Sequence, residues 1–111
     1  MAARNALLTA VPYQVERSLN KLGADLKTAR LRRNLTIEDV ARKIGTSRFV
    51  VADAERGKAS TGIVTYAAML WVYGLLDRFA EVADPSKDEE GTTLSLTRER
   101  ARRSRKLDND F

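Results

Sequence analysis

Helical spacing of the apolar residues is the feature that most constrains how this chain can fold. Between Pro12 and Pro85, apolar side chains recur at steps of three and four residues. No stretch there alternates with a period of two for long enough to suggest a strand. The first series starts at Val15 and runs to about Arg33, which is the pattern of one face of an amphipathic helix. The chain is therefore predicted to be all-α.

Capping residues and glycines divide the rest of this region into shorter helices. Thr36 and Asp39 have the spacing of a capping box. Gly45 ends the helix that they begin, because glycine readily adopts the left-handed conformation of a C-cap. Ser47 can cap the next helix, which reaches about Arg56. Two more helices are expected over residues 61–73 and 75–83.

The spacing of three small or apolar residues favours a helix-turn-helix over two unrelated helices. Ala41 must be small where the second helix crosses the first, Gly45 supplies the turn, and Val51 roots the second helix in the core. The alternative is two ordinary helices with a glycine between them, but this alternative requires that all three positions match the motif by chance.

Composition narrows the function. The chain of 111 residues has no cysteine and no histidine, which excludes disulfides, cysteine or histidine metal ligands and histidine acid–base chemistry. We therefore expect no enzyme, no metal and no cofactor. A net charge of +5, from 20 basic and 15 acidic residues, favours a polyanionic partner, most simply nucleic acid. No apolar run reaches the length of a signal-peptide core or a membrane span, so we expect a cytoplasmic protein with no membrane contact.

The residues from Leu35 to Ser47, followed by Glu55-Arg56-Gly57-Lys58, resemble the Cro/CI (XRE) family of phage and bacterial repressors. The similarity covers roughly residues 22–74 and implies a five-helix, lambda-repressor-like DNA-binding domain. A weaker second similarity lies in residues 75–79, 83–85 and 88–91, which resemble HipB-like antitoxins, the DNA-binding partners of HipA-type kinase toxins.

The resemblance implies that the helix starting at Ser47 enters the major groove. Arg48 can read guanine O6 and N7, or can contact only a phosphate. Phe49 can meet a thymine methyl group or pack on a neighbouring helix, and Asp53 can accept from a cytosine amino group or pair with an arginine. The expected base contacts are Ser47, Arg48, Phe49, Ala52 and Asp53.

Phosphate contacts are expected from the start of the motif's first helix and from the basic residues around it. They are Thr36, Ile37, Arg42, Lys43, Arg56 and Lys58. Ile37 departs from the family, which commonly has a glutamine at this position, so the side-chain contact of that glutamine is missing. The resemblance also implies a structural ion pair between Arg30 and Glu55, whose loss would strand a partly buried charge and cost about 3 kcal/mol.

No charged residue occurs from Ala59 to Leu76, and this stretch predicts a surface for a second subunit. The face with Ile63, Ala67 and Leu70 is expected to pack on the motif. The opposite face has no obvious cover in so small a domain, which favours a homodimer, although residues 1–14 or the tail could cover it instead. The expected dimer interface is Met69, Trp71 and Tyr73.

The expected domain organisation is an N-terminal arm over residues 1–14, the DNA-binding and dimerisation domain over residues 15–85, and a charged tail over residues 86–111. Residues 92–97 alternate weakly and suggest a short strand, and the tail is expected to be ordered only in part. The basic run over residues 98–106 can hold DNA phosphates, bind an acidic partner or form a solvated helix.

These features together predict a transcriptional repressor that binds a palindromic DNA operator as a homodimer. The preferred setting is the autoregulating antitoxin of a toxin–antitoxin operon, with a kinase-like toxin as partner. The alternatives are a stand-alone or phage-type repressor and a protein-interaction adaptor that has lost DNA binding. Ile37 and Asp53 are the residues that favour the adaptor.

Overall fold

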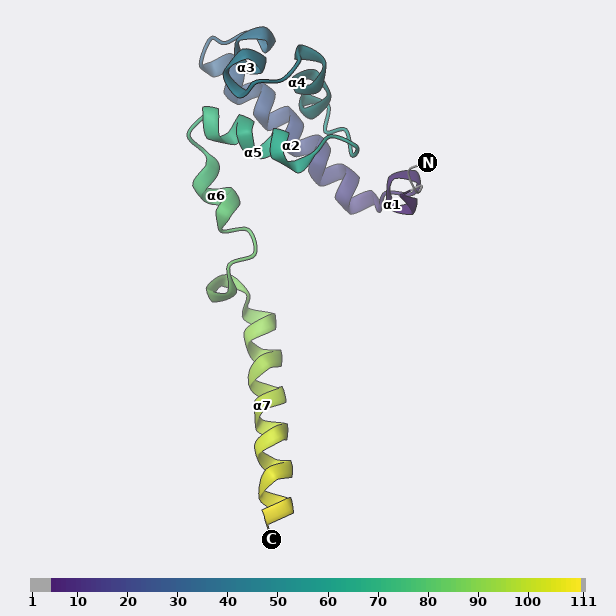
Figure 1. The fold of residues 1–111 in the computed structure, drawn as a ribbon, viewed down its shortest axis with the longest axis vertical. Helices are drawn as coiled ribbons and strands as arrows, with labels where there is room; N and C mark the ends of the chain where they lie inside the picture. The colour runs from purple at the N-terminus through teal and green to yellow at the C-terminus, as the bar shows by residue number, and fades with distance from the viewer. Residues whose placement is uncertain (1–4, 111) are drawn as a thin grey trace. The chain divides into compact units, whose positions relative to one another are not determined.

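The computed structural model of the chain describes residues 5–110, which form helices joined by turns and loops and contain no strand (Figure 1). The chain divides into two compact units, Met1–Phe79 and Ala80–Phe111. The all-α prediction is confirmed. Among the described residues no helix is long and apolar enough to cross a bilayer. The helices are α1 (Ala6–Thr9), α2 (Tyr13–Arg32), α3 (Ile37–Ile44), α4 (Arg48–Glu55), α5 (Ile63–Val72), α6 (Leu76–Ala80), the 3-10 turn η1 (Pro85–Lys87) and α7 (Glu89–Asp110).

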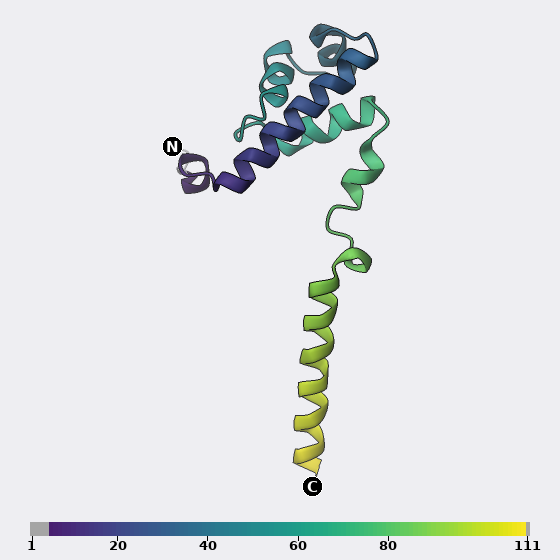
Figure 2. The same cartoon turned by 180° about the vertical axis from the view of Figure 1, so that it is seen from behind.

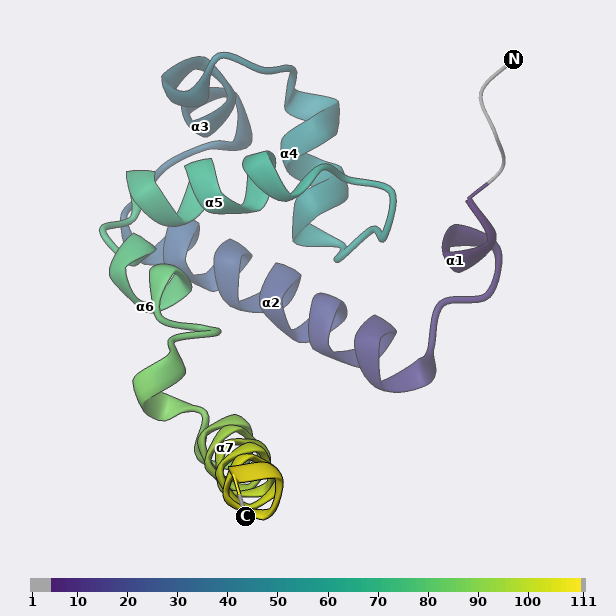
Figure 3. The same cartoon turned by 60° about the horizontal axis from the view of Figure 1, so that its bottom comes forward.

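The first unit is built on the long helix α2. Helices α3, α4 and α5 pack on one another, and α4 also packs on α2 (Figure 3). The residues at their meeting point form one apolar core, in which each short helix buries one side. The core consists of Leu26, Ala29, Val40, Ala41, Val51, Ala54, Tyr66, Met69 and Tyr73.

Local signals define the two helices of the motif as predicted. The Thr36 hydroxyl accepts a hydrogen bond of 3.0 Å from the Asp39 amide, and the Asp39 carboxylate accepts one of 2.9 Å from the Thr36 amide, which completes the capping box. Gly45 ends α3 with a φ of 80°. The Ser47 hydroxyl caps α4 by accepting from the Val50 amide at 3.3 Å.

Helices α2 and α4 approach so closely that two glycines form their contact. A Cβ added to Gly23 would lie 2.6 Å from the carbonyl oxygens of Ala54 and Glu55, and a Cβ on Gly57 would lie 2.4 Å from the Leu19 carbonyl oxygen. Gly57 also has a φ of 70°, a backbone conformation that residues other than glycine rarely adopt. The helix pair is thus held backbone to backbone.

The expected orientation of α5 is wrong in part: Leu70 packs against the core as expected, but three other residues do not lie where they were expected. Met69 (0% exposed) and Tyr73 (3%) belong to the core, so they do not lie on an uncovered face, whereas Ile63, expected to face the motif, is 69% exposed. Tyr66, Met69 and Tyr73 follow one another at steps of three and four, and it is this stripe that packs inward. Only Trp71 of the expected dimer residues is exposed, at 62%.

The second unit is dominated by α7, which Figure 2 shows as one uninterrupted helix. The expected strand over residues 92–97 is wrong, because this segment lies within α7. The Asp88 side chain accepts from the Gly91 amide at 3.0 Å in the first turn of the helix. A weak alternation of Thr and Leu does not make a strand without a second strand to pair with.

Candidate nucleic-acid interface

Helix α4 is anchored on one side and open on the other. Val51 and Ala54 are fully buried in the core, which fixes the rotation of the helix about its axis. Arg48 and Phe49 are exposed on the opposite side, and Ser47 lies exposed at its start. Ala52 and Asp53 are half-buried. The structure thus brings Arg48, Phe49 and Ala52 together on one side of α4, whereas Ser47 is the N-cap before the helix and Asp53 pairs with residues beyond its end.

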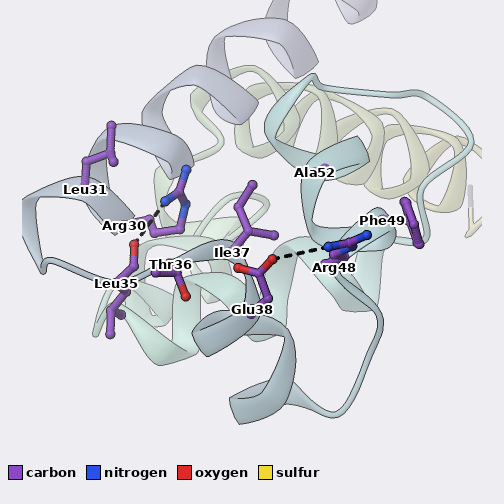
Figure 4. Close-up of a pocket in the computed structure, with 9 residues that line it drawn as sticks. All are labelled: Arg30, Leu31, Leu35, Thr36, Ile37, Glu38, Arg48, Phe49 and Ala52. Carbon is purple, nitrogen blue, oxygen red and sulfur yellow. Dashed lines mark hydrogen bonds and ion pairs between the residues drawn. The ribbon is translucent and has the colours of Figure 1, made fainter.

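Two neighbours position the Arg48 side chain. The Arg48 Nη1 atom lies 3.7 Å from the Glu38 Oε1 atom of α3, and the guanidinium carbon lies 5.0 Å from the centre of the Phe49 ring (Figure 4). Both members of the ion pair are largely exposed, so the pair contributes little to stability. Its effect is on direction: the carboxylate and the ring restrict where the planar guanidinium points.

The same neighbours border a hollow of about 520 Å³ between the end of α2, the start of α3 and α4. Leu31, Leu35 and Ile37 contribute apolar side chains to it, and Arg48 and Phe49 lie on its α4 side (Figure 4). Phe49 is 67% exposed, so packing on a neighbouring helix does not bury it. An exposed ring next to a guanidinium gives α4 an apolar group and a hydrogen-bond donor side by side. Base edges in the major groove offer partners for both, namely thymine methyl groups and hydrogen-bond acceptors.

Asp53 engages two of the residues expected to contact phosphates. Its Oδ1 atom forms an ion pair with Arg56, and its Oδ2 atom lies 3.4 Å from the Lys58 Nζ atom. Of the two roles open to Asp53 in the sequence, pairing with an arginine is the one seen in this structure. The acidic charge is therefore partly neutralised by the end of the motif itself.

The start of α3 offers free backbone amides, although not all of those expected. The Thr36 amide is engaged by Asp39, which makes it unavailable to a phosphate in this structure. Within residues 5–110 the amides of Ile37 and Glu38 have no partner, as is usual for the first turn of a helix. The hydrogen bonds with the Thr36 backbone and side chain lower the pKa of Asp39, so its carboxylate holds the cap at neutral pH. Arg42 and Lys43 are exposed on the same helix.

The predicted pair between Arg30 and Glu55 is present. Arg30 Nε donates to Glu55 Oε2 at 2.7 Å and Nη2 donates to Oε1 at 3.0 Å, while Nη1 donates to the Leu35 carbonyl at 3.0 Å. The side chains are only 8% and 5% exposed. The hydrogen bonds to Glu55 raise the pKa of Arg30 despite this burial. The pair ties α2 to the end of α4 and so supports the orientation of the recognition surface.

Sequence reasoning missed Glu38 as part of this interface. Its sequence position gave a signal, since it lies in the first turn of the first motif helix while Arg48 opens the second. The distance between the two side chains depends on how the turn folds back, which spacing alone does not give.

Comparison with known proteins agrees with this geometry. Residues 21–82, more than half of the chain, match a family model described as a helix-turn-helix domain. The chain belongs to this helix-turn-helix family, and it is a DNA-binding regulator of that class. No curated protein and no solved structure matches the chain.

Proposed function

We propose that this protein is a transcriptional repressor that places α4 in the major groove of a two-fold symmetric operator. The observation that carries the proposal is the anchoring of α4, whose buried side holds Val51 and Ala54 while its open side presents Arg48 and Phe49. A helix held in this way can bring its first residues to base edges and repress by occupying the site.

The role proposed for each residue follows from which side chains and backbone amides are exposed. Arg48 reads a guanine with its planar fork, and Phe49 meets a thymine methyl group, with Ser47 and Ala52 beside them. The amide of Ile37 and the exposed side chains of Arg42 and Lys43 meet phosphates. Arg56 and Lys58 also contact phosphates, and Asp53 orients them through its ion pairs.

We further propose a homodimer that uses the outer side of α5. Ile63, Val64 and Trp71 are exposed there, in a stretch that contains no charged residue from Ala59 to Leu76. An uncharged apolar surface of this kind is costly to leave in water and suits a second copy of itself. Two-fold symmetry would place the two α4 helices about 34 Å apart, one turn of DNA.

Selection from a randomised duplex library at moderate salt tests the repressor proposal. The wild type should enrich a two-fold symmetric site, and Arg48→Ala should relax one base position in each half-site. Arg42→Ala is the matched control, since loss of a phosphate contact should weaken binding to all sequences about equally. If the wild type enriches no sequence, the repressor proposal is wrong and the adaptor function takes its place.

The proposed biological setting is an autoregulating antitoxin. It is supported by the similarity of residues 75–79, 83–85 and 88–91 to HipB-like antitoxins, and it requires a kinase-like toxin as partner. Co-expression with the neighbouring genes of its own operon, followed by purification of the complex, tests it. Recovery of the regulator alone, with operator binding intact, would leave a stand-alone repressor.

A further inference from the structure

Helix α7 concentrates positive charge on one side. Between Arg98 and Lys106 the chain has six basic residues and one acidic residue. At about 100° per residue, Arg98, Arg102 and Arg105 fall within roughly 60° of one another around the helix, and Lys106 lies next to them. These four residues are called the basic arc below.

Repulsion among the charges of the basic arc destabilises α7. Arg98 and Arg102, and Arg102 and Lys106, are four residues apart, where like charges destabilise a helix. The ion pair in this segment of the described chain joins Arg103 to Glu99 at 3.1 Å and involves no member of the arc. Glu89 and Glu90 favour the start of the helix through its dipole, but that effect fades within the first turn.

Burial does not offset this repulsion. From residue 89 to residue 109 every side chain is exposed except Gly91, which is half-buried. Most helices in proteins are stabilised by packing an apolar side, and α7 buries no such side. An anionic ligand bound along the arc would neutralise the repulsion between its cations and so stabilise α7.

We propose that the basic arc binds the phosphate backbone of the DNA that the first unit occupies. This inference rests on DNA binding by the helix-turn-helix, and it assigns a second contact to the same ligand. Residues 80–88 tether α7 to the first unit, so a duplex held there is present at high effective concentration. Duplex DNA carries a charge about every 1.7 Å along its axis, so each cation of the arc can meet a phosphate without a matched surface.

An acidic protein is the competing ligand, but it needs carboxylates placed to fit. The arc spans residues 98–106, about 12 Å of helix axis, with its cations on one side within about 100° of one another. Four cations with a single leucine at one end, and no apolar side chain between them, fit a regular polyanion better than a folded surface. Leu96 and Leu107 lie on the opposite side of α7 from Arg98 and Arg105, and Leu94, one turn before Arg98, is the exposed leucine on the side of the arc.

Hydrogen exchange of the full chain with and without a long mixed-sequence duplex tests the proposal. Amides of residues 98–106 should gain protection with the duplex, together with amides of α3 and α4. A triple variant with Arg98→Gln, Arg102→Gln and Arg105→Gln should lose the protection in α7 and keep it in α3 and α4. The matched variant with Arg98→Lys, Arg102→Lys and Arg105→Lys keeps the charge and should behave as the wild type, since Lys, Gln and Arg have similar helix propensities.

The salt dependence of binding gives a second readout. The slope of log K against log salt should fall by about two to three for the glutamine variant and stay unchanged for the lysine variant, because each phosphate contact contributes about 0.9. Protection confined to α3 and α4, with equal slopes for all variants, would overturn the proposal while leaving DNA binding by the first unit intact. Protection in neither unit would overturn both.

Discussion

Two single residues show how local surroundings act on this fold: Tyr73 in the core and Glu38 beside Arg48. The Tyr73 hydroxyl is buried and has no hydrogen-bond partner among residues 5–110. Burial raises the pKa of Tyr73 to about 12. The Arg33 guanidinium carbon lies 5.5 Å from the centre of the Tyr73 ring, and Arg33 donates to the Tyr73 carbonyl at 2.9 Å. The ring is therefore well held, whereas its hydroxyl is not.

Tyr73→Phe should raise the free energy of unfolding by about 1 kcal/mol, because a buried polar group without a partner is removed and the ring is kept. Urea denaturation at pH 7 measures this. The folded state favours neutral Tyr73, because its pKa there is about 12 and in the unfolded chain about 10. Ionisation of Tyr73 therefore leaves the free energy of unfolding unchanged below about pH 10 and lowers it as the pH rises toward 12. The alkaline fall in stability should thus be smaller in the variant. A variant less stable than the wild type at pH 7 would show that the hydroxyl has a partner in solution.

The second residue is Glu38, which holds Arg48 but also brings a negative charge to a DNA-binding surface. Glu38→Gln should raise overall affinity for DNA at low salt, because a charge that repels phosphates is removed. It should also lower discrimination at the base that Arg48 reads, by up to about 1 kcal/mol, because the guanidinium loses its fixed direction. Binding to matched and mismatched operators measures both effects. Glu16→Gln, at an exposed position on α2, is the charge control; equal discrimination in all three proteins would contradict the positioning role.

Elements whose ends depend on local chemistry follow from the sequence. The Thr36 and Asp39 cap, the Gly45 turn and the Ser47 cap each need only a few neighbouring residues, and all three are confirmed. The orientation of α5 could not be obtained in this way. Its side chains are apolar all round, so the helical period does not say whether Met69 or Ile63 faces inward. Only the positions of α3 and α4 decide it.

The contact between α2 and α4 also depends on tertiary structure, since a glycine inside a helix has several explanations. Gly23→Ala should lower the free energy of unfolding by at least about 2 kcal/mol, although alanine favours a helix by about 1 kcal/mol, because the new methyl group meets three backbone atoms at 2.6 Å. Gly62→Ala is the control, since nothing lies within 4 Å of its added Cβ. Thermal unfolding of both variants measures the difference. Equal stabilities would mean that the helices separate at little cost.

For the whole molecule, the sequence predicts a helix-turn-helix because the spacing of a few small and apolar residues defines this motif. The match to a helix-turn-helix family model confirms the motif. The base and phosphate contacts stay predictions, because they depend on a ligand as well as on the chain. The sequence offers a solvated helix only as one alternative for residues 98–106 and does not predict the full length of α7, because residues 89–110 have no regular apolar period. In the whole chain the charge is also uneven, with basic residues in the motif and in residues 98–106 and acidic ones gathered over residues 81–90.

Dimerisation is the property of the whole molecule that the outer side of α5 predicts. Trp71→Gln should convert a dimer into a monomer, because it removes the largest exposed apolar group of the uncharged stretch, and the core should be unaffected since Trp71 lies outside it. Sedimentation equilibrium measures the change, and Val15→Gln, at an exposed position on α2, is the matched control. Binding to a single half-site should be retained while the gain from a second half-site is lost. A wild type that sediments as a monomer at the concentrations that saturate its operator would rule out a dimer preformed through this surface.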